Sequence, residues 1–139
     1  QTSNGFQLAL PVLLLSGLQH LVATPEQMQQ VPEYAQDYLR RLPGQWDESR
    51  FLDGYPGKFV VIARRAGARW YVAGINGSPK SMRLELDLSF IPAGQGMLIR
   101  DGEQPRELQL HQIAAGQQQL DLPAASGFVM LFEKERGLP

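Results

Sequence analysis

Residues 58–76, KFVVIARRAGARWYVAGIN, carry the strongest fold signal in this sequence. β-Branched and aromatic residues dominate both halves of the stretch, and such residues suit a pleated, packed surface. Gly67 separates the two halves and offers the positive φ that a short hairpin loop requires. The stretch therefore predicts two antiparallel strands joined by a tight turn at Ala66 and Gly67.

The first of these strands has no polar residue between Phe59 and Ala63. A strand with one face in water would alternate apolar and polar side chains, so this strand is expected to be covered on both faces. A second sheet can cover one face, and we expect a neighbouring domain to cover the other.

The rest of the chain from Trp46 onward reads as short strands separated by turn residues. Strand-like patterns are found at residues 50–52, 58–65, 69–75, 82–88, 96–101, 106–112, 117–122 and 128–133. Several short strands at this spacing are typical of an antiparallel sandwich or barrel. We predict a mainly β protein, with an antiparallel β-sandwich over residues 46–139 that follows two to three α-helices within residues 1–45.

Two features define the helical part. Residues 6–22 are apolar on every side of a helix, which predicts burial inside something larger than a surface groove. The remaining residues look too few to wrap this helix and also to build a β-domain, so burial in a larger protein or in an oligomer is expected. A second helical pattern follows Thr24 and Pro25, shows one apolar face from Tyr34 to Leu42, and ends at Pro43 and Gly44.

The long apolar run is a poor membrane segment. It is short for a bilayer span, and polar residues, glycine and proline interrupt it. A signal-peptide core is a weaker interpretation than a buried helix, because no lysine or arginine precedes the run. The chain begins with Gln1 and not with methionine, which suggests a processed or partial polypeptide.

Charge and composition exclude several classes of function. The 139 residues carry 13 basic and 14 acidic side chains, so the net charge of -1 gives no basic footprint for nucleic acid. The absence of cysteine removes disulfides, thiolate metal sites and a cysteine nucleophile. The two histidines, His20 and His111, are far apart in sequence and are expected to be structural or solvated. We therefore predict no metal site and no cofactor.

Two groups of residues remain as candidates for chemistry. Asp47 and Glu48 are neighbouring carboxylates, but adjacent side chains on a strand point to opposite faces, so ion pairing is the favoured interpretation. Trp46, Tyr55, Trp70 and Tyr71 are candidates for sugar stacking or for a domain interface, and core packing is the favoured alternative. An oligosaccharide is thus a candidate ligand.

Several motifs resemble one known family. The stretch WDESRFLDGYPGKFVVIARRAGARWYVAGING, together with LELDLSF and MLIRDGEQP, resembles the C-terminal β-domain of family-97 glycoside hydrolases, the bacterial α-glucosidases and α-galactosidases. The upstream FQLALPVLLLSGLQHLVATPEQM resembles the last helix of that family's catalytic (β/α)₈ barrel and the link that leaves it.

The resemblance implies a non-catalytic C-terminal portion of an exo-acting α-glycosidase that braces the barrel and is periplasmic or secreted. In the family, the catalytic carboxylates and calcium ligands lie earlier in the chain. No position here matches them, so the chain alone is expected to be inactive. Two other functions stay open: a carbohydrate-binding module, and a free-standing assembly domain that forms homo-oligomers through the apolar helix.

Overall fold

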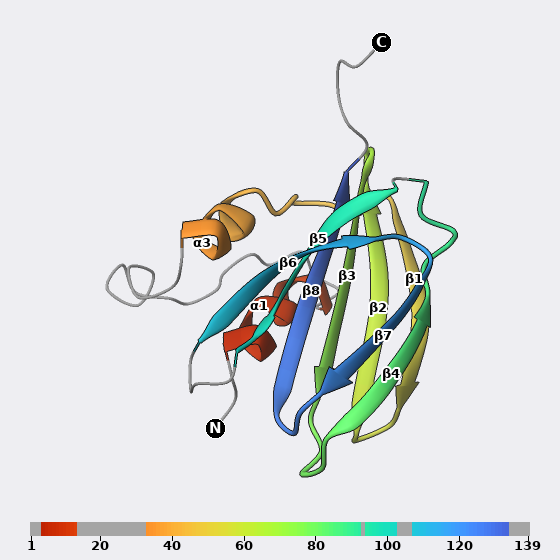
Figure 1. Ribbon diagram of the computed structural model, residues 1–139. Coiled ribbons are helices and arrows are strands. Elements are labelled where there is room, and N and C mark those ends of the chain that lie inside the picture. Colours follow the sequence, from red (N-terminus) through yellow and green to blue (C-terminus); the bar gives the residue numbers. More distant parts are fainter. Residues whose placement is uncertain (1–3, 14–32, 93, 103–106, 134–139) are drawn as a thin grey trace.

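A computed structural model describes residues 4–13, 33–92, 94–102 and 107–133 of the chain. In this part the chain forms a six-stranded antiparallel sheet, a two-stranded sheet packed on one of its faces, and helices on the other (Figure 1). The helices are α1 (Asn4–Leu13) and α3 (Glu33–Arg40). The strands are β1 (Glu48–Tyr55), β2 (Phe59–Ala66), β3 (Arg69–Asn76), β4 (Met82–Asp87), β5 (Gln95–Asp101), β6 (Leu108–Ala114), β7 (Gln117–Leu122) and β8 (Ser126–Glu133).

The sheet order explains why the fold is a sandwich. The large sheet runs β1-β2-β3-β8-β5-β6, and the small sheet pairs β4 with β7. The predicted hairpin is confirmed: Ala66 pairs with Arg69, and Gly67 has a φ of 61° in the turn. Each predicted strand is also present, so the mainly β prediction is confirmed. The strand predicted at residues 50–52 is longer than expected, because β1 continues through Asp53 and Gly54 to Tyr55. The apolar core of the sandwich lies between the two sheets.

The sequence predicted that β2 is covered on both faces, but the structure shows this for two other strands. In β2, Val61 and Ala63 are fully buried against the small sheet, but Val60 and Ile62 on the opposite face are only half-buried. The doubly covered strands are β3 and β8 at the centre of the large sheet. There Trp70 and Phe128 face the sandwich core, while Tyr71 and Val129 face the helices.

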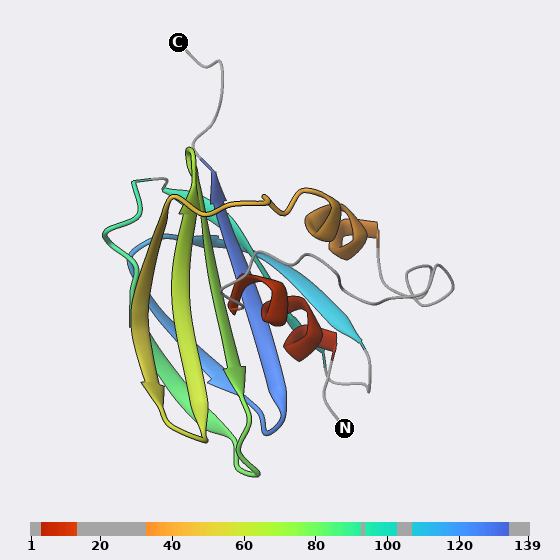
Figure 2. The same ribbon diagram turned by 180° about the vertical axis from the view of Figure 1, so that it is seen from behind.

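The chain's own large sheet covers one face of the described part of the apolar helix. Leu8, Ala9 and Val12 of α1 are buried in a second apolar cluster with the outer face of β3, β5 and β8. Figure 2 shows α1 lying across that face. Ala35 of α3 joins the same cluster. The predicted helical residues 14–22, the helix start at Thr24 and the histidine His20 lie outside the described residues. No helix in the described part is long and apolar enough to span a membrane.

Candidate functional site

The first turn of α1 packs directly on the large sheet, backbone against backbone, and we call this contact the seat of α1. Gly5 and Gly127 meet so closely that a Cβ atom at Gly127 would lie 2.6 Å from the Cα atom of Phe6, and one at Gly5 would overlap the Gly127 carbonyl oxygen. The Asp101 carboxylate at the end of β5 accepts a hydrogen bond of 2.9 Å from the Gly5 backbone N–H. A carboxylate at this position satisfies a free donor in the first turn of the helix and complements its dipole. The sandwich thus holds the start of α1 by shape and by charge.

Ion pairs join the segment after α3 to the same sheet. Glu133, at the end of β8, contacts Arg41 at 3.2 Å and Arg69 at 3.1 Å. The Tyr71 hydroxyl donates a hydrogen bond of 3.4 Å to the Arg41 carbonyl. Each such surface pair is worth little by itself, but together they fix where the chain passes from the helical layer into the sandwich.

Trp46 lies at that passage and contacts buried groups. Its ring meets the Tyr71 ring edge to face, with centroids 5.2 Å apart, and the Arg64 guanidinium lies 5.8 Å from its ring centre. Tyr71 and Arg64 have exposed fractions of only 1% and 2%. Burial lowers the pKa of Arg64 from its ordinary value. Tyr71 is buried and offers no ring face to a sugar, and the half-buried Trp46 packs against the second apolar cluster.

Trp70 belongs to the sandwich core. It has an exposed fraction of 4%, and its ring packs edge to face on Phe90 at 5.1 Å. The guanidinium of Arg50 covers the two rings, at 4.5 Å from the centre of Phe90 and 5.6 Å from that of Trp70. A buried ring cannot stack on a sugar, so the core alternative that the sequence favoured is the one that fits Trp70.

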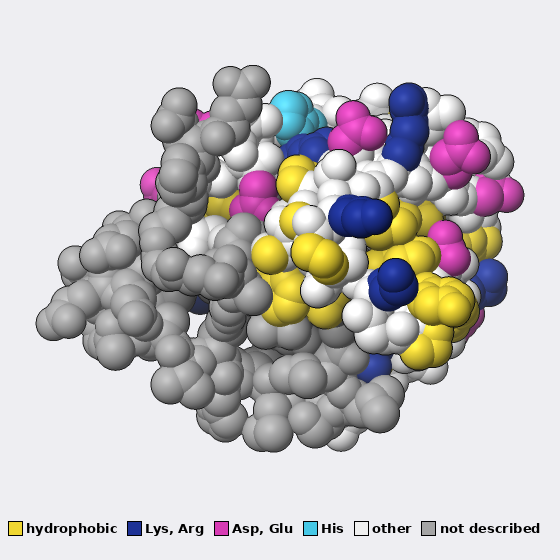
Figure 3. All heavy atoms as spheres, turned by 90° about the horizontal axis from the view of Figure 1, so that it is seen from below, with side chains coloured by type: hydrophobic (Ala, Val, Ile, Leu, Met, Phe, Trp, Pro, Cys, Tyr) yellow, Lys and Arg dark blue, Asp and Glu magenta, His cyan; other side chains and the backbone are white. Residues whose placement is uncertain are grey.

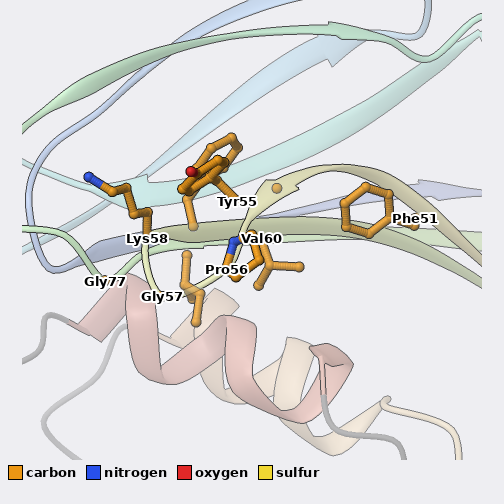
Figure 4. A pocket seen from close by; sticks show the side chains of 10 residues that line it. Phe51, Tyr55, Pro56, Gly57, Lys58, Val60 and Gly77 are labelled. Carbon is orange, nitrogen blue, oxygen red and sulfur yellow. The ribbon is translucent and has the colours of Figure 1, made fainter.

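Tyr55 is the only one of the four aromatic candidates that is exposed, at 61%. It lines an open groove of about 420 Å³ beside the β1–β2 turn, together with Phe51, Lys58, Val60 and Ile75. Figure 4 shows Phe51, Tyr55 and Val60 around this groove, with the Lys58 side chain extending away from Phe51. Sequence reasoning missed Phe51, which is 68% exposed. The only signal for it was its place in the strand predicted at residues 50–52.

The neighbouring carboxylates Asp47 and Glu48 are ion-paired, as their place in the sequence suggested. Asp47 accepts a hydrogen bond of 2.8 Å from the Gly67 backbone N–H and lies 3.7 Å from Arg65. Glu48 contacts Arg50 at 2.8 Å and Arg65 at 3.3 Å. These carboxylates join β1 to the hairpin turn and do not flank a common cavity.

The pairing of Glu48 gives a pH-dependent prediction. Hydrogen bonds from Arg50 and then from Arg65 lower the pKa of Glu48 below its ordinary value of 4.5. A lowered acid pKa contributes stability above the unfolded-state pKa, and this contribution is lost as the pH falls through the folded-state pKa. In Glu48→Gln the urea midpoint is expected to fall less steeply below pH 4.5 than in the parent chain. Identical pH profiles for the two proteins would contradict this role.

Metal chemistry finds no support in the described part of the chain. Among these residues, no group of three histidine, aspartate or glutamate side chains could hold a metal ion. His111 lies on β6, is exposed, and its Nε2 is 3.2 Å from the side-chain oxygen of Gln109.

Comparison with known proteins shows which family this sequence matches. Residues 45–133 match the family model described as "Glycosyl-hydrolase 97 C-terminal, oligomerisation". The chain is 43% identical over 72 residues to a probable retaining alpha-galactosidase of Streptomyces bingchenggensis. It is 38% identical over 98 residues to a retaining alpha-galactosidase of Bacteroides thetaiotaomicron. These alignments cover 52% and 69% of this chain.

A solved structure extends the likeness to the helical part. The crystal structure of a beta-arabinopyranosidase superposes with a TM-score of 0.86 at 36% identity over 94% of this chain. The chain spans 21% of that protein and 11% and 14% of the two alpha-galactosidases. It corresponds to a non-catalytic C-terminal portion of a family-97 enzyme. This chain belongs to the family of C-terminal domains of glycosyl hydrolase 97.

Proposed function

We propose that this chain braces the catalytic region of an α-galactoside-cleaving enzyme. The observation that carries the proposal is the seat of α1, whose first turn fits between Gly127 and Asp101 of the sandwich. If α1 is the last helix of the catalytic barrel, as the family resemblance implies, this contact fixes the barrel and the sandwich as one body. If α1 left the sheet, Leu8, Ala9 and Val12 would become exposed to water. Burial of each large apolar side chain stabilises the contact by about 1.5–3 kcal/mol.

The names of the relatives support the substrate class. Two of them are called alpha-galactosidases, which favours α-galactosides over the α-glucosides that the resemblance also implied. A beta-arabinopyranosidase shares this fold at 36% identity. Enzymes named for different sugars therefore carry this domain, which fits a bracing role better than sugar selection. Catalytic carboxylates and calcium ligands in the barrel, and a periplasmic or secreted location, belong to the same proposal.

The bracing role is tested in the longer polypeptide in which this proposal places the chain. Val12→Asp would put a carboxylate into a fully buried apolar site and loosen α1 from the sheet. We expect thermal inactivation to become at least about tenfold faster, as a loss of 1.4 kcal/mol or more would cause. The kcat/KM for an aryl α-galactoside at low temperature should stay unchanged.

Two controls separate bracing from catalysis. Glu85→Gln changes an exposed side chain on the outer face of the small sheet and should leave the inactivation rate as it is. The isolated chain should not cleave the aryl galactoside. A Val12→Asp enzyme that inactivates at the parental rate, or that loses kcat/KM at low temperature without losing stability, would count against the brace.

A second role, self-association, is favoured by one specific observation. The matching family model carries the word oligomerisation in its description. The sequence pointed to the apolar helix as the contact, but the Leu8, Ala9 and Val12 face of that helix is covered by this chain's own sheet. We therefore propose that copies of this chain associate through another surface.

A further inference from the structure

Each of the two asparagines in this chain, Asn4 and Asn76, is followed by a glycine. In such a pair the backbone nitrogen of the glycine can attack the side-chain amide carbon of the asparagine, because glycine has no Cβ atom to hinder a close approach. The backbone nitrogen gives its proton to hydroxide and forms a bond to the amide carbon, and the side-chain nitrogen takes up a proton and leaves as ammonia. Water then opens the cyclic imide to aspartate or isoaspartate. Asn76 and Gly77 are thus a candidate site for deamidation.

The fold buries one partner of this reaction and exposes the other. Asn76 has an exposed fraction of 0%, whereas Gly77 is exposed. The pair lies where β3 ends, at the end of the sandwich that also carries the β1–β2 and β7–β8 connections (Figure 1). Figure 3 looks onto this end, which is a mixed surface of hydrophobic, charged and uncharged polar groups. Because hydroxide can reach Gly77, protection of the pair has to come from its hydrogen bonds.

Hydrogen bonds hold both reacting groups of the pair in place. The Gly77 N–H donates to the Lys58 carbonyl at 2.7 Å, so the attacking nitrogen is already engaged with the residue before β2. The leaving nitrogen, Nδ2 of Asn76, lies within hydrogen-bond distance of three backbone carbonyls, those of Lys80, Leu122 and Pro123. Attack needs the reacting atoms aligned at about 3–3.5 Å. The amide cannot turn toward the Gly77 nitrogen without giving up these partners.

Two further hydrogen bonds would act in the opposite direction. The Ser78 backbone N–H and hydroxyl donate to Oδ1 of Asn76, at 2.9 Å and 2.8 Å. Donors at this oxygen stabilise the negative charge that it gains when the amide carbon is attacked. They act only once the Gly77 nitrogen can reach that carbon. The hydrogen bonds that hold Gly77 and Nδ2 therefore decide the outcome.

The product of the reaction does not fit the folded chain. Aspartate at position 76 would place a carboxylate oxygen where Nδ2 lies, against three carbonyl oxygens. Burial of a charge without a partner is strongly unfavourable. Isoaspartate adds a carbon atom to the backbone, which would displace the hydrogen bond between Gly77 and Lys58. Chemical modification of the unfolded state is one way in which unfolding becomes irreversible.

We propose that Asn76 and Gly77 form a deamidation site that the fold keeps unreactive, and that its reaction in unfolded copies prevents them from refolding. The rate of deamidation in the folded protein then follows the fraction of molecules in which the corner after β3 is open. This inference does not depend on the proposed bracing role.

Peptide mapping by mass spectrometry measures the reaction at mildly alkaline pH, in the folded chain and in the chain unfolded in urea. Deamidation at Asn76 should be at least about a hundredfold slower in the folded chain. In Ser78→Ala the rate in the folded chain should rise about fivefold, because the network that holds the amide is weaker by one hydrogen bond. The rate in urea should not change.

The opposite results would overturn the protection. Equal rates in the folded and the unfolded chain would show that the hydrogen bonds of Asn76 and Gly77 do not prevent the reaction. A faster rate in the folded chain, lowered by Ser78→Ala, would show that the Ser78 donors promote deamidation instead.

Gly77→Ala is the matched variant that keeps the fold and blocks the chemistry. A Cβ atom at Gly77 would meet only the Lys58 carbonyl oxygen, at an ordinary contact distance of 3.6 Å, and Gly77 has no positive φ. The added methyl group hinders attack by the backbone nitrogen. Both proteins are held in alkaline urea until half of Asn76 in the parent chain has reacted, and are then refolded by dilution. The refolded fraction should fall by that half in the parent chain and stay near its starting value in Gly77→Ala.

The second Asn-Gly pair does not affect this comparison, because Asn4 and Gly5 are the same in both proteins. Thermal melts before the incubation establish that Gly77→Ala and Ser78→Ala start folded. If the deamidated parent molecules refold as well as the unreacted ones, the reaction does not prevent refolding, and that part of the proposal is wrong. Loss of refolding at the parental rate in Gly77→Ala would show that Asn76 is not the cause.

Discussion

Replacing Asn76 with alanine is expected to lower the free energy of unfolding by roughly 3 kcal/mol, because the side chain is fully buried and joins two segments of the chain, residues 78–80 and 122–123. Its Nδ2 lies 2.8 Å from the Lys80 carbonyl, 3.1 Å from that of Leu122 and 3.2 Å from that of Pro123. Its Oδ1 accepts hydrogen bonds from the backbone N–H and the hydroxyl of Ser78. Alanine would remove all of these hydrogen bonds, although the Lys80 carbonyl would keep the Ser78 hydroxyl and the Pro123 carbonyl the Ser126 hydroxyl as donors.

Urea unfolding of the parent chain and of Asn76→Ala measures this loss. Ser78→Ala is the control, because it removes one hydroxyl from the same network and should cost only about 1 kcal/mol. Asn76→Asp separates the two sides of the amide, since a carboxylate keeps the acceptor but meets three carbonyl oxygens where the donor was. We expect Asn76→Asp to be at least as unstable as Asn76→Ala near neutral pH. Equal stability of the parent chain and Asn76→Ala would show that the loops hold without this residue.

Nothing in the sequence indicated that Asn76 would be buried. Asn76 and Gly77 form a common turn dipeptide directly after the strand predicted at residues 69–75, and β3 ends at Asn76. The burial of Asn76 depends on the segment near Leu122 and Pro123, which returns to the same end of the sandwich from 46 or more residues away. Local sequence patterns hold no information on such a meeting.

The positions of the strands were predictable because their sequence signals are local. Turn residues and strand-like patterns are local signals, and they located the hairpin at Gly67 and the strand at residues 82–88, which is β4. Alternation fails where both faces are covered, so the pattern could not tell that Trp70 faces the sandwich core and Tyr71 the helices. For the same reason the sequence could not separate the exposed Tyr55 from the buried aromatic residues.

The seat of α1 was missed because it is made of backbone. Two glycines, Gly5 and Gly127, are far apart in sequence, and neither stands in a motif. The apolar pattern of α1 predicted burial correctly but assigned it to a larger body, whereas the large sheet already covers one face. The exposed groove at Phe51 escaped notice because an apolar residue in a strand is first read as core.

Gly127→Val is expected to release α1 from the sheet while the strands remain folded. Gly127 lies in β8 and has no positive φ, so valine suits the strand itself and the effect is steric. The new side chain would begin 2.6 Å from the Phe6 Cα atom and 2.9 Å from the Gly5 carbonyl oxygen, which are backbone atoms that cannot rotate away. We expect a loss of roughly 3 kcal/mol or more as Leu8, Ala9 and Val12 lose their contacts.

Hydrogen exchange shows whether the loss is local. Amides of residues 8–13 should exchange far faster in Gly127→Val, while those of the β2–β3 hairpin should keep most of their protection. Gly44→Val is the matched control, because a Cβ atom at Gly44 would meet nothing within 4 Å. If protection of α1 is unchanged in Gly127→Val, the glycine contact does not hold the helix, and the bracing role would have to rest on the apolar face of α1 alone. If the whole sandwich loses protection together, α1 and the sheet unfold as one unit, which would make the brace a part of the domain's own core.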